Sequence, residues 1–290
     1  MPKVILLGAL LVAAGAGAPS AWPAPQDAAA PAPALVADAD REAFLLEAQI
    51  VKTRSAPGGI TGSTRATLRR GDIVHDAHIQ TIDQRKAVSE LSTGVEVDFR
   101  DSWRNNVAAY RLDRMLGLGM VPVTVVRSSD GKPAAFTWWV DDVIMDEKQH
   151  YQKKISTPDV EAWNCQMFVV RVFDQLIYNT DRNLGNLLID KEWRMWMIDH
   201  TRAFKIFKDV KAEKNLGTRC ERNLLAALRR LDKPTVQASM KDLLDPGQID
   251  GLLGRRDGIV QYYDDKVRTL GEEAVLYELP SRVSVTAAPR

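Results

Sequence analysis

Apolar and polar side chains alternate along several short segments between residues 41 and 145. Such alternation is typical of half-buried strands, and it predicts strands at residues 49–54, 64–70, 73–82, 121–126 and 136–140. Gly71 and Gly131 mark the turns between two pairs of these segments. Helical spacing instead predicts a short helix at 42–48 and a longer one at 103–116. This part of the chain is therefore predicted to be a small β-rich region with one main helix.

A three- and four-residue period replaces the alternation after residue 150. The clearest series predicts a helix with one buried face that leads to Asp181: Trp163, Met167, Val170, Phe173 and Ile177. Apolar runs at 187–189 and 194–198 predict a hairpin that places Asp199 at the end of a strand. Further helices are predicted at 223–231, 235–244, 246–253 and 257–270. The whole pattern predicts an α+β protein with a β-rich first part and a mainly helical second part.

Composition and charge narrow the class of protein. The chain has 290 residues, enough for one two-lobed domain or two small domains. Its 45% apolar and 27% charged content is ordinary for a globular protein. A net charge of +1, with basic residues dispersed along the chain, argues against a dominant nucleic-acid-binding surface. We therefore expect no nucleic-acid partner.

The N-terminus has the features of an export signal. Lys3 precedes an apolar run at 4–14, and Ala16, Gly17 and Ala18 supply small residues for cleavage. The run is shorter than the roughly 20 apolar residues that a membrane span needs, so we expect no transmembrane span in the mature chain. An uncleaved anchor is the alternative. We predict a signal peptide at 1–18 and an Ala/Pro-rich linker at 19–40, and hence an exported protein: secreted, periplasmic or in a secretory-pathway lumen.

The two cysteines, Cys165 and Cys220, leave two possibilities open. In an oxidising compartment they could form one disulfide, or each could be a small buried thiol. No Cys and His residues have the spacing of a zinc site.

Two acids and an amide have the spacing of a phosphoryl-transfer site. Asn186 follows Asp181 by five positions, and Asp199 follows Asn186 by 13. The first interval is that of a kinase catalytic loop, in which an Asp orients the acceptor hydroxyl and an Asn binds magnesium. This chemistry depends mostly on positioning and on metal held by hard oxygen ligands, which these residue types supply. The alternative is an ordinary solvated loop in which Asp181 is a cap.

The loop Asp181-Arg182-x-x-x-Asn186, with the strand end Ile198-Asp199-His200, resembles that of the atypical kinases of the HipA, Fam20 and phosphatidylinositol 3-/4-kinase type. A second match, at residues 108–122, resembles the N-lobe helix and following strand of bacterial and secreted members. The resemblance implies a two-lobed protein-kinase-like fold. It places the nucleotide-covering N-lobe at 41–145, the C-lobe with the catalytic loop at 146–275, and a C-terminal tail at 276–290.

The resemblance also implies ATP, with Mg or Mn, as the cofactors and assigns roles to single residues. Asp181 would accept or orient the hydroxyl proton, while Asn186 and Asp199 would hold the metal. The glycine-rich segment 58–63 lies between two predicted strands, where it could cover the nucleotide. Its candidate binding residues are Gly59, Thr61, Gly62 and Ser63.

One departure from the family pattern concerns an expected lysine and glutamate. The resemblance calls for a phosphate-binding lysine near the end of the third strand and a glutamate in the N-lobe helix. This chain has Gln80 and Asn106 at those places. Because the lysine and the glutamate are both replaced, no unpaired charge is left at the site. The two amides could then hydrogen-bond each other at the nucleotide site. Lys86 or Arg85 is a further candidate to reach the phosphates.

Three functions fit this sequence. The first is an exported atypical kinase that transfers the ATP γ-phosphate to a hydroxyl acceptor on a protein, sugar or lipid. The second is a pseudokinase that acts as a nucleotide-binding or regulatory module, which Gln80 and Asn106 would allow. The third is an unrelated exported binding domain in which the loop motif is accidental.

Overall fold

The structure is a computed structural model that describes residues 35, 37–55, 63–91, 94–210 and 213–279. The predicted signal peptide, most of the linker and the glycine-rich loop residues Gly59, Thr61 and Gly62 lie outside these ranges. The first helix, α1 (Asp38–Glu47), begins four residues before its predicted start, so the predicted linker overlaps it. Within the described ranges, no helix is both long and apolar enough to cross a membrane.

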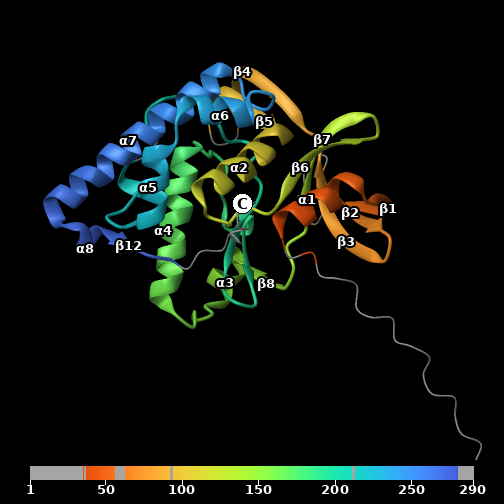
Figure 1. Cartoon of the computed structure of the whole chain (residues 1–290), viewed down its shortest axis with the longest axis horizontal. Helices are drawn as coiled ribbons and strands as arrows, with labels where there is room; N and C mark the ends of the chain where they lie inside the picture. The colour runs from red at the N-terminus through yellow and green to blue at the C-terminus, as the bar shows by residue number, and fades with distance from the viewer. Residues whose placement is uncertain (1–34, 36, 56–62, 92–93, 211–212, 280–290) are drawn as a thin grey trace, which may run out of the picture. The chain divides into compact units, whose positions relative to one another are not determined.

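A five-stranded antiparallel sheet with the order β1-β2-β3-β7-β6 forms the first part (Figure 1). Its strands are β1 (Gln49–Ser55), β2 (Ser63–Arg70), β3 (Ile73–Gln80), β6 (Thr124–Ser129) and β7 (Lys132–Trp138). Alternate side chains of a strand lie on the same face of the sheet, and on one face these are apolar and buried, as Leu68 and Ile79 are. The sequence pattern therefore predicted this sheet correctly, except at some strand ends.

β7 begins four residues before its predicted start at residue 136, and β6 begins three residues after its predicted start at residue 121. The backbone N–H groups of Met120 and Val121 donate to Asp113 Oδ1 at 2.9 and 3.1 Å. Gly119 N donates to the other carboxylate oxygen, Oδ2, at 2.9 Å. Since a buried carboxylate satisfies these N–H groups, the chain joins the sheet only at Thr124.

Two helices pack on this part of the molecule. α1 contacts β2, β6 and β7, and α2 (Trp103–Leu116) contacts β6 and β7 (Figure 1). α2 has the predicted bounds because the residues that cap its two ends, Ser102 and Gly117, can be recognised in the sequence. The Ser102 hydroxyl accepts from Arg104 N at 3.3 Å, and Gly117 ends the helix with a left-handed φ of 72°.

A long β-hairpin, which follows β3 and precedes α2 along the chain, was not predicted. It consists of β4 (Asp83–Leu91) and β5 (Gly94–Ser102), which pair with each other in a separate two-stranded sheet. Val88, Val95 and Val97 are exposed, whereas Phe99 and Arg100 in the second half of β5 are buried. Because β4 is mostly polar and exposed, its sequence carries no alternation from which a strand could be predicted.

The second part is mainly helical, as predicted. Its helices are α3 (Glu147–Lys153), α4 (Val160–Leu176), α5 (Arg222–Arg230), α6 (Lys233–Met240), α7 (Pro246–Leu270) and α8 (Glu272–Val275), with 3-10 turns η1 (Leu184–Asn186) and η2 (Glu213–Asn215). Its strands are β8 (Val143–Asp146), β9 (Leu187–Asp190), β10 (Met195–Met197), β11 (Cys220–Glu221) and β12 (Leu276–Tyr277). The predicted hairpin is β9–β10, to which β8 adds a third strand. β12 pairs with β11, so the first residues of the predicted tail belong to the fold.

α7 is one helix of 25 residues, where two helices were predicted at 246–253 and 257–270 (Figure 1). The glycines near the predicted break are packing positions. A Cβ on Gly251 would lie 2.6 Å from the Lys205 carbonyl oxygen, and one on Gly254 would lie 2.7 Å from Lys208 Cβ. Glycine is required there because the segment 205–208 runs directly against the helix.

Cys165 and Cys220 are buried free thiols, so the disulfide alternative is wrong. Burial raises the pKa of the Cys165 thiol to about 11, and it raises that of Cys220 further. Both thiols are therefore protonated near neutral pH and act as small apolar side chains.

Candidate functional site

The loop after α4 is held in place by Arg182. Its Nε lies 2.9 Å from Asp174 Oδ2 on α4, and both side chains are nearly buried, with exposed fractions of 13% and 11%. Its Nη1 donates to the carbonyl oxygens of Asn186 and Ile198, at 3.0 and 2.7 Å. One guanidinium thus joins the end of the loop to the residue before Asp199.

The three residues predicted to carry the chemistry are brought together by this arrangement. Ile198 N donates to Asn186 O at 3.1 Å, which places Asn186 beside the strand end that carries Asp199. Asn186 Nδ2 donates to Asp181 O at 3.5 Å, which closes the loop from the other side. Asp199 has a left-handed φ of 56°, a conformation that is often kept at functional sites despite its strain.

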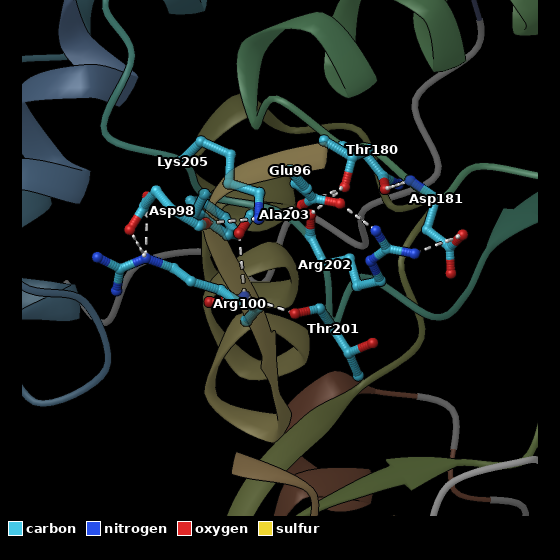
Figure 2. Close-up of polar contacts among 12 residues, drawn as sticks. Glu96, Asp98, Arg100, Thr180, Asp181, Thr201, Arg202, Ala203 and Lys205 are labelled. Atoms are coloured by element: carbon cyan, nitrogen blue, oxygen red, sulfur yellow. Dashed lines mark hydrogen bonds and ion pairs between the residues drawn. The ribbon is translucent and has the colours of Figure 1, made fainter. Parts of the chain in front are cut away.

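Asp181 is half-exposed and faces a cation. Its Oδ1 lies 3.3 Å from Arg202 Nη1 (Figure 2). Burial raises the pKa of Asp181; Arg202 opposes this rise, while the carboxylates of Asp199 and Glu96 add to it. A carboxylate with a raised pKa is suited to take a proton.

The hairpin strand β5 holds Arg202 in this position. Glu96 accepts from Arg202 Nη2, from Lys205 Nζ at 2.7 Å and from the Thr180 hydroxyl at 3.4 Å (Figure 2). Lys205 has a side-chain exposure of only 1% and also donates to Asp98 O at 2.8 Å. The hairpin of β4 and β5, which was not predicted, therefore supplies the Glu96 carboxylate that orients Arg202 toward Asp181.

This network predicts a specific pH dependence of stability. Burial alone raises the pKa of Glu96, but Lys205 and Arg202 outweigh it, so the pKa lies below its ordinary value of 4.5. Such a group stabilises the fold above its unfolded-state pKa, and this stabilisation is lost as the pH falls below 4.5. Glu96→Gln should therefore lower the free energy of unfolding at pH 7, with a difference from wild type that shrinks in acid.

Urea unfolding at pH 7 and at several values below pH 4.5 measures this difference. The control is Glu90→Gln, on an exposed residue of the same hairpin, which should match wild type throughout. An equal loss of stability at every pH would show that Glu96 acts through its shape and not its charge.

Two residues near Asp199 were missed by the sequence analysis. Burial raises the pKa of Asp101 on β5, and the carboxylates of Asp199 and Asp181 raise it further. Asp101 Oδ1 is buried and has no hydrogen-bond partner in the described part of the chain. No local signal marks Asp101, because the hairpin that carries it was not predicted.

His78 on β3 is the other missed residue. Its Nε2 contacts the Ser63 hydroxyl, and burial lowers its pKa while the nearby Asp199 carboxylate opposes that change. His78 lies two positions before Gln80, and residues two apart on a strand share a face. Alternation along β3 could therefore have indicated it.

Gln80 and Asn106 do not bind each other, so the expected amide pair is wrong. Gln80 Oε1 accepts from the backbone N–H groups of Thr81 and Ile82, at 3.0 and 3.1 Å. Asn106 Oδ1 accepts from His200 N at 2.7 Å. Each amide oxygen already has backbone partners, and Asn106 holds the turn after Asp199. Their role in nucleotide binding stays a prediction.

The other predicted nucleotide contacts have different outcomes. Of the four glycine-rich-loop candidates, Ser63 alone lies in the described ranges, at the start of β2 beside His78. Arg85 Nη1 lies 3.3 Å from Asp245 Oδ2, and Asp245 caps the start of α7. Lys86 Nζ lies 5.8 Å from the centre of the Phe99 ring.

The residues around Asp199 fit a hard divalent cation. No group of three His, Cys, Asp or Glu side chains in the described ranges is arranged to hold a metal by itself. The candidate set instead combines the Asn186 amide with the Asp199 carboxylate, and Asp101 adds a buried oxygen that lacks a partner. Such oxygen donors suit Mg²⁺ and Mn²⁺.

Comparison with known proteins identifies the fold. No protein-family model and no curated protein sequence matches the chain. Among solved structures, the chain is similar to hydra Fam20 with sugar, with a TM-score of 0.63 and 14% identity over 83% of this chain and 92% of that one. It is also similar to the Golgi casein kinase with Mn/ADP bound, with a TM-score of 0.57 and 14% identity over 84% of this chain and 80% of that one. The Golgi casein kinase without a named ligand matches at a TM-score of 0.57 and 13% identity. The chain therefore has the two-lobed fold of an atypical kinase of the Fam20 type, as its two sequence motifs predicted.

Proposed function

We propose that the protein is an exported atypical kinase that transfers the γ-phosphate of ATP to a hydroxyl acceptor. The observation that carries this proposal is the convergence of Asp181, Asn186 and Asp199 through Arg182. These residue types match the needs of phosphoryl transfer, in which the protein mainly positions groups and stabilises charge. The shared fold supports the proposal.

Each residue then has a defined task. Asp181 orients the acceptor hydroxyl and takes its proton as the oxygen attacks the phosphorus atom. Arg202, held by Glu96, fixes the position of the Asp181 carboxylate. Asn186 and Asp199, with Asp101 as a third oxygen donor, would hold Mg or Mn, which neutralises charge on the phosphates. His78 and Ser63 border the same site from the sheet.

Nucleotide and metal use is supported by the Golgi casein kinase structure, which contains Mn and ADP. The hydra Fam20 structure contains a sugar, and we keep sugar hydroxyls among the candidate acceptors. For this chain the acceptor class stays open among protein, sugar and lipid hydroxyls. Export rests on the predicted signal peptide at 1–18 and the linker that follows it. The N-lobe at 41–145 and C-lobe at 146–275 remain the proposed division of the chain.

A pseudokinase is the second candidate, and one observation favours it. β3 contains no lysine, and Gln80 at its end binds the neighbouring backbone instead of facing a phosphate. A nucleotide could still bind through the residues around Asp199. In that case the protein would bind nucleotide with metal but would not turn it over.

Formation of ADP separates the two candidates. The mature chain, starting near Trp22, should convert Mn-ATP or Mg-ATP slowly to ADP even without an acceptor, since water can replace the hydroxyl. Asp199→Ala should reduce this to background, because the metal ligand is lost. Asp72→Ala, on an exposed turn residue between β2 and β3, is the control and should keep full activity. Metal-dependent nucleotide binding without ADP formation in wild type would overturn the kinase proposal in favour of the pseudokinase.

A further inference from the structure

A cavity of about 320 Å³ lies outside the site described above. It is bounded by the start of β4, the end of β5, the first turn of α2 and the junction between α6 and α7. Its volume is in the range of small-molecule sites, roughly 300 to 1,000 Å³. It is therefore large enough for a small organic molecule and not only for a single ion.

Four cations line this cavity: Arg85, Arg100, Arg104 and Lys241. Three carboxylates lie among them, those of Asp83, Asp242 and Asp245, and a fourth, that of Asp98, binds Arg100 from outside the lining. Asp245 is shared, since it lies 3.3 Å from Arg85 and 3.0 Å from Arg100 and also caps α7 by accepting from Gln248 N. Lys241 forms no ion pair within the described part of the chain. Arg104 is paired with Asp83 at 3.2 Å, so three of the four cations already face a carboxylate, and among the described residues Lys241 is the one that does not.

Arg100 supplies the donor that points to a ligand. The residue is only 6% exposed, and its Nε is bound by the Asp98 carboxylate at 3.0 Å. Its Nη2 is buried and lies near Asp245, but that contact lacks hydrogen-bond geometry, so Nη2 has no hydrogen-bond partner. A buried guanidinium donor without a partner is costly, and an anion in the cavity would satisfy it.

Two helices begin at the cavity wall. Arg104 and Asn105 are in the first turn of α2, and Gln248 is in the first turn of α7. The N-termini of helices favour negative charge, which adds to the field of the four cations. Cations in planar, forked geometry together with helix N-termini are the usual surroundings of a bound phosphate.

The same lining residues hold the chain segment that follows Asp199. Asn105 Nδ2 donates to the carbonyl oxygens of Thr201 and Ala203, at 2.7 and 3.0 Å. Gln248 Nε2 donates to Phe204 O at 2.8 Å. Asp98, which binds Arg100, accepts from Ile206 N at 3.3 Å. Figure 2 shows Arg100 and Asp98 beside Thr201, Ala203 and Lys205. The cavity is therefore connected by hydrogen bonds to residues 201–206, which include Arg202.

We propose that this cavity binds a small phosphate-bearing molecule, and that the ligand stabilises the segment 201–206 and thereby the position of Arg202 against Asp181. The ligand is an effector and not the nucleotide of the proposed reaction, because Asp181, Asn186 and Asp199 are not among the residues that line the cavity. Phosphate groups accept from the side chains of Arg85, Arg100, Arg104 and Lys241, which line the cavity. Binding does not depend on the proposed kinase activity and can be measured without it.

Inorganic pyrophosphate, with EDTA to remove divalent metal, is the probe. At constant ionic strength, wild type should show a saturable rise in Tm with pyrophosphate concentration. The double variant Arg85→Ala/Lys241→Ala should bind at least ten times more weakly. Both of its residues are exposed, so the fold should survive. The control Lys132→Ala/Lys153→Ala removes the same charge from exposed positions elsewhere and should bind as wild type does.

Asp199→Ala separates this cavity from the nucleotide site and should bind pyrophosphate as wild type does. Hydrogen exchange should also slow at the backbone amides of residues 201–206 when pyrophosphate is added. The proposal is overturned by the absence of a saturable shift, by a shift that persists in the Arg85→Ala/Lys241→Ala variant, or by one lost in Asp199→Ala. The last result would place the anion in the nucleotide site.

Discussion

Asp181→Asn is expected to lower the rate of ADP formation by about 10²- to 10⁴-fold, the range that general-base catalysis supplies. Nucleotide affinity should change little, because Asp181 faces Arg202 and the acceptor position and is not one of the proposed metal ligands. Asparagine keeps the shape of the side chain but cannot take the hydroxyl proton. A fall in kcat with unchanged nucleotide affinity is therefore the predicted result.

Steady-state ADP formation gives kcat, and a thermal titration with metal-nucleotide gives affinity for the same protein samples. Asp72→Asn, on the exposed turn residue used above, is the matched control and should leave both values unchanged. If Asp181→Asn weakened nucleotide binding as much as it lowered kcat, Asp181 would belong to the nucleotide site and its role as base would be wrong.

Arg182→Ala is expected to destabilise the fold by about 3 to 5 kcal/mol, the cost of leaving one partner of a buried ion pair alone. Asp174 would keep its Asn179 contact at 3.1 Å but lose its counter-charge in a nearly buried place. The carbonyl oxygens of Asn186 and Ile198 would also lose their common donor. Loss of this connection should loosen the loop that carries Asp181 and Asn186.

Urea unfolding of four proteins measures this effect: wild type, Arg182→Ala, Asp174→Asn and the double variant. The double variant should be more stable than the sum of the single changes predicts, because no charge is left unpaired. Lys191→Ala is the comparison, since its pair with Asp142 is more than half-exposed on both sides and is expected to contribute little to the free energy of unfolding. If the Arg182→Ala loss were no larger than that of Lys191→Ala, the loop would not depend on Arg182.

Local sequence signals were sufficient for the elements that depend on local interactions. α2 was predicted with its correct bounds because Ser102 and Gly117 cap an amphipathic helix. Asp181, Asn186 and Asp199 could be proposed as one site because they lie within a stretch of 19 residues that contains a predicted hairpin. Both results depend on contacts between residues that are near in the sequence.

Contacts between distant residues could not be predicted in this way. Glu96 and Asp101 reach the site only because β5 folds over residues 180–205, and no local pattern encodes that placement. The glycines of α7 look like helix breaks until the segment 205–208 is seen against them. The sequence allowed Gln80 and Asn106 to bind each other, but Gln80 accepts from the next two backbone N–H groups, and Asn106 accepts from the distant His200 N.

Thermal stability of the mature chain in Mg-ATP and Mn-ATP tests the central claim most directly, because it requires no acceptor. A ligand at 100 times its Kd adds about 2.7 kcal/mol to the free energy of unfolding, which is a readily measured rise in Tm. We predict a nucleotide-dependent rise that requires metal, is lost in Asp199→Ala and is kept in Asp72→Ala. No rise at millimolar nucleotide, or an equal rise in Asp199→Ala, would contradict the proposed site.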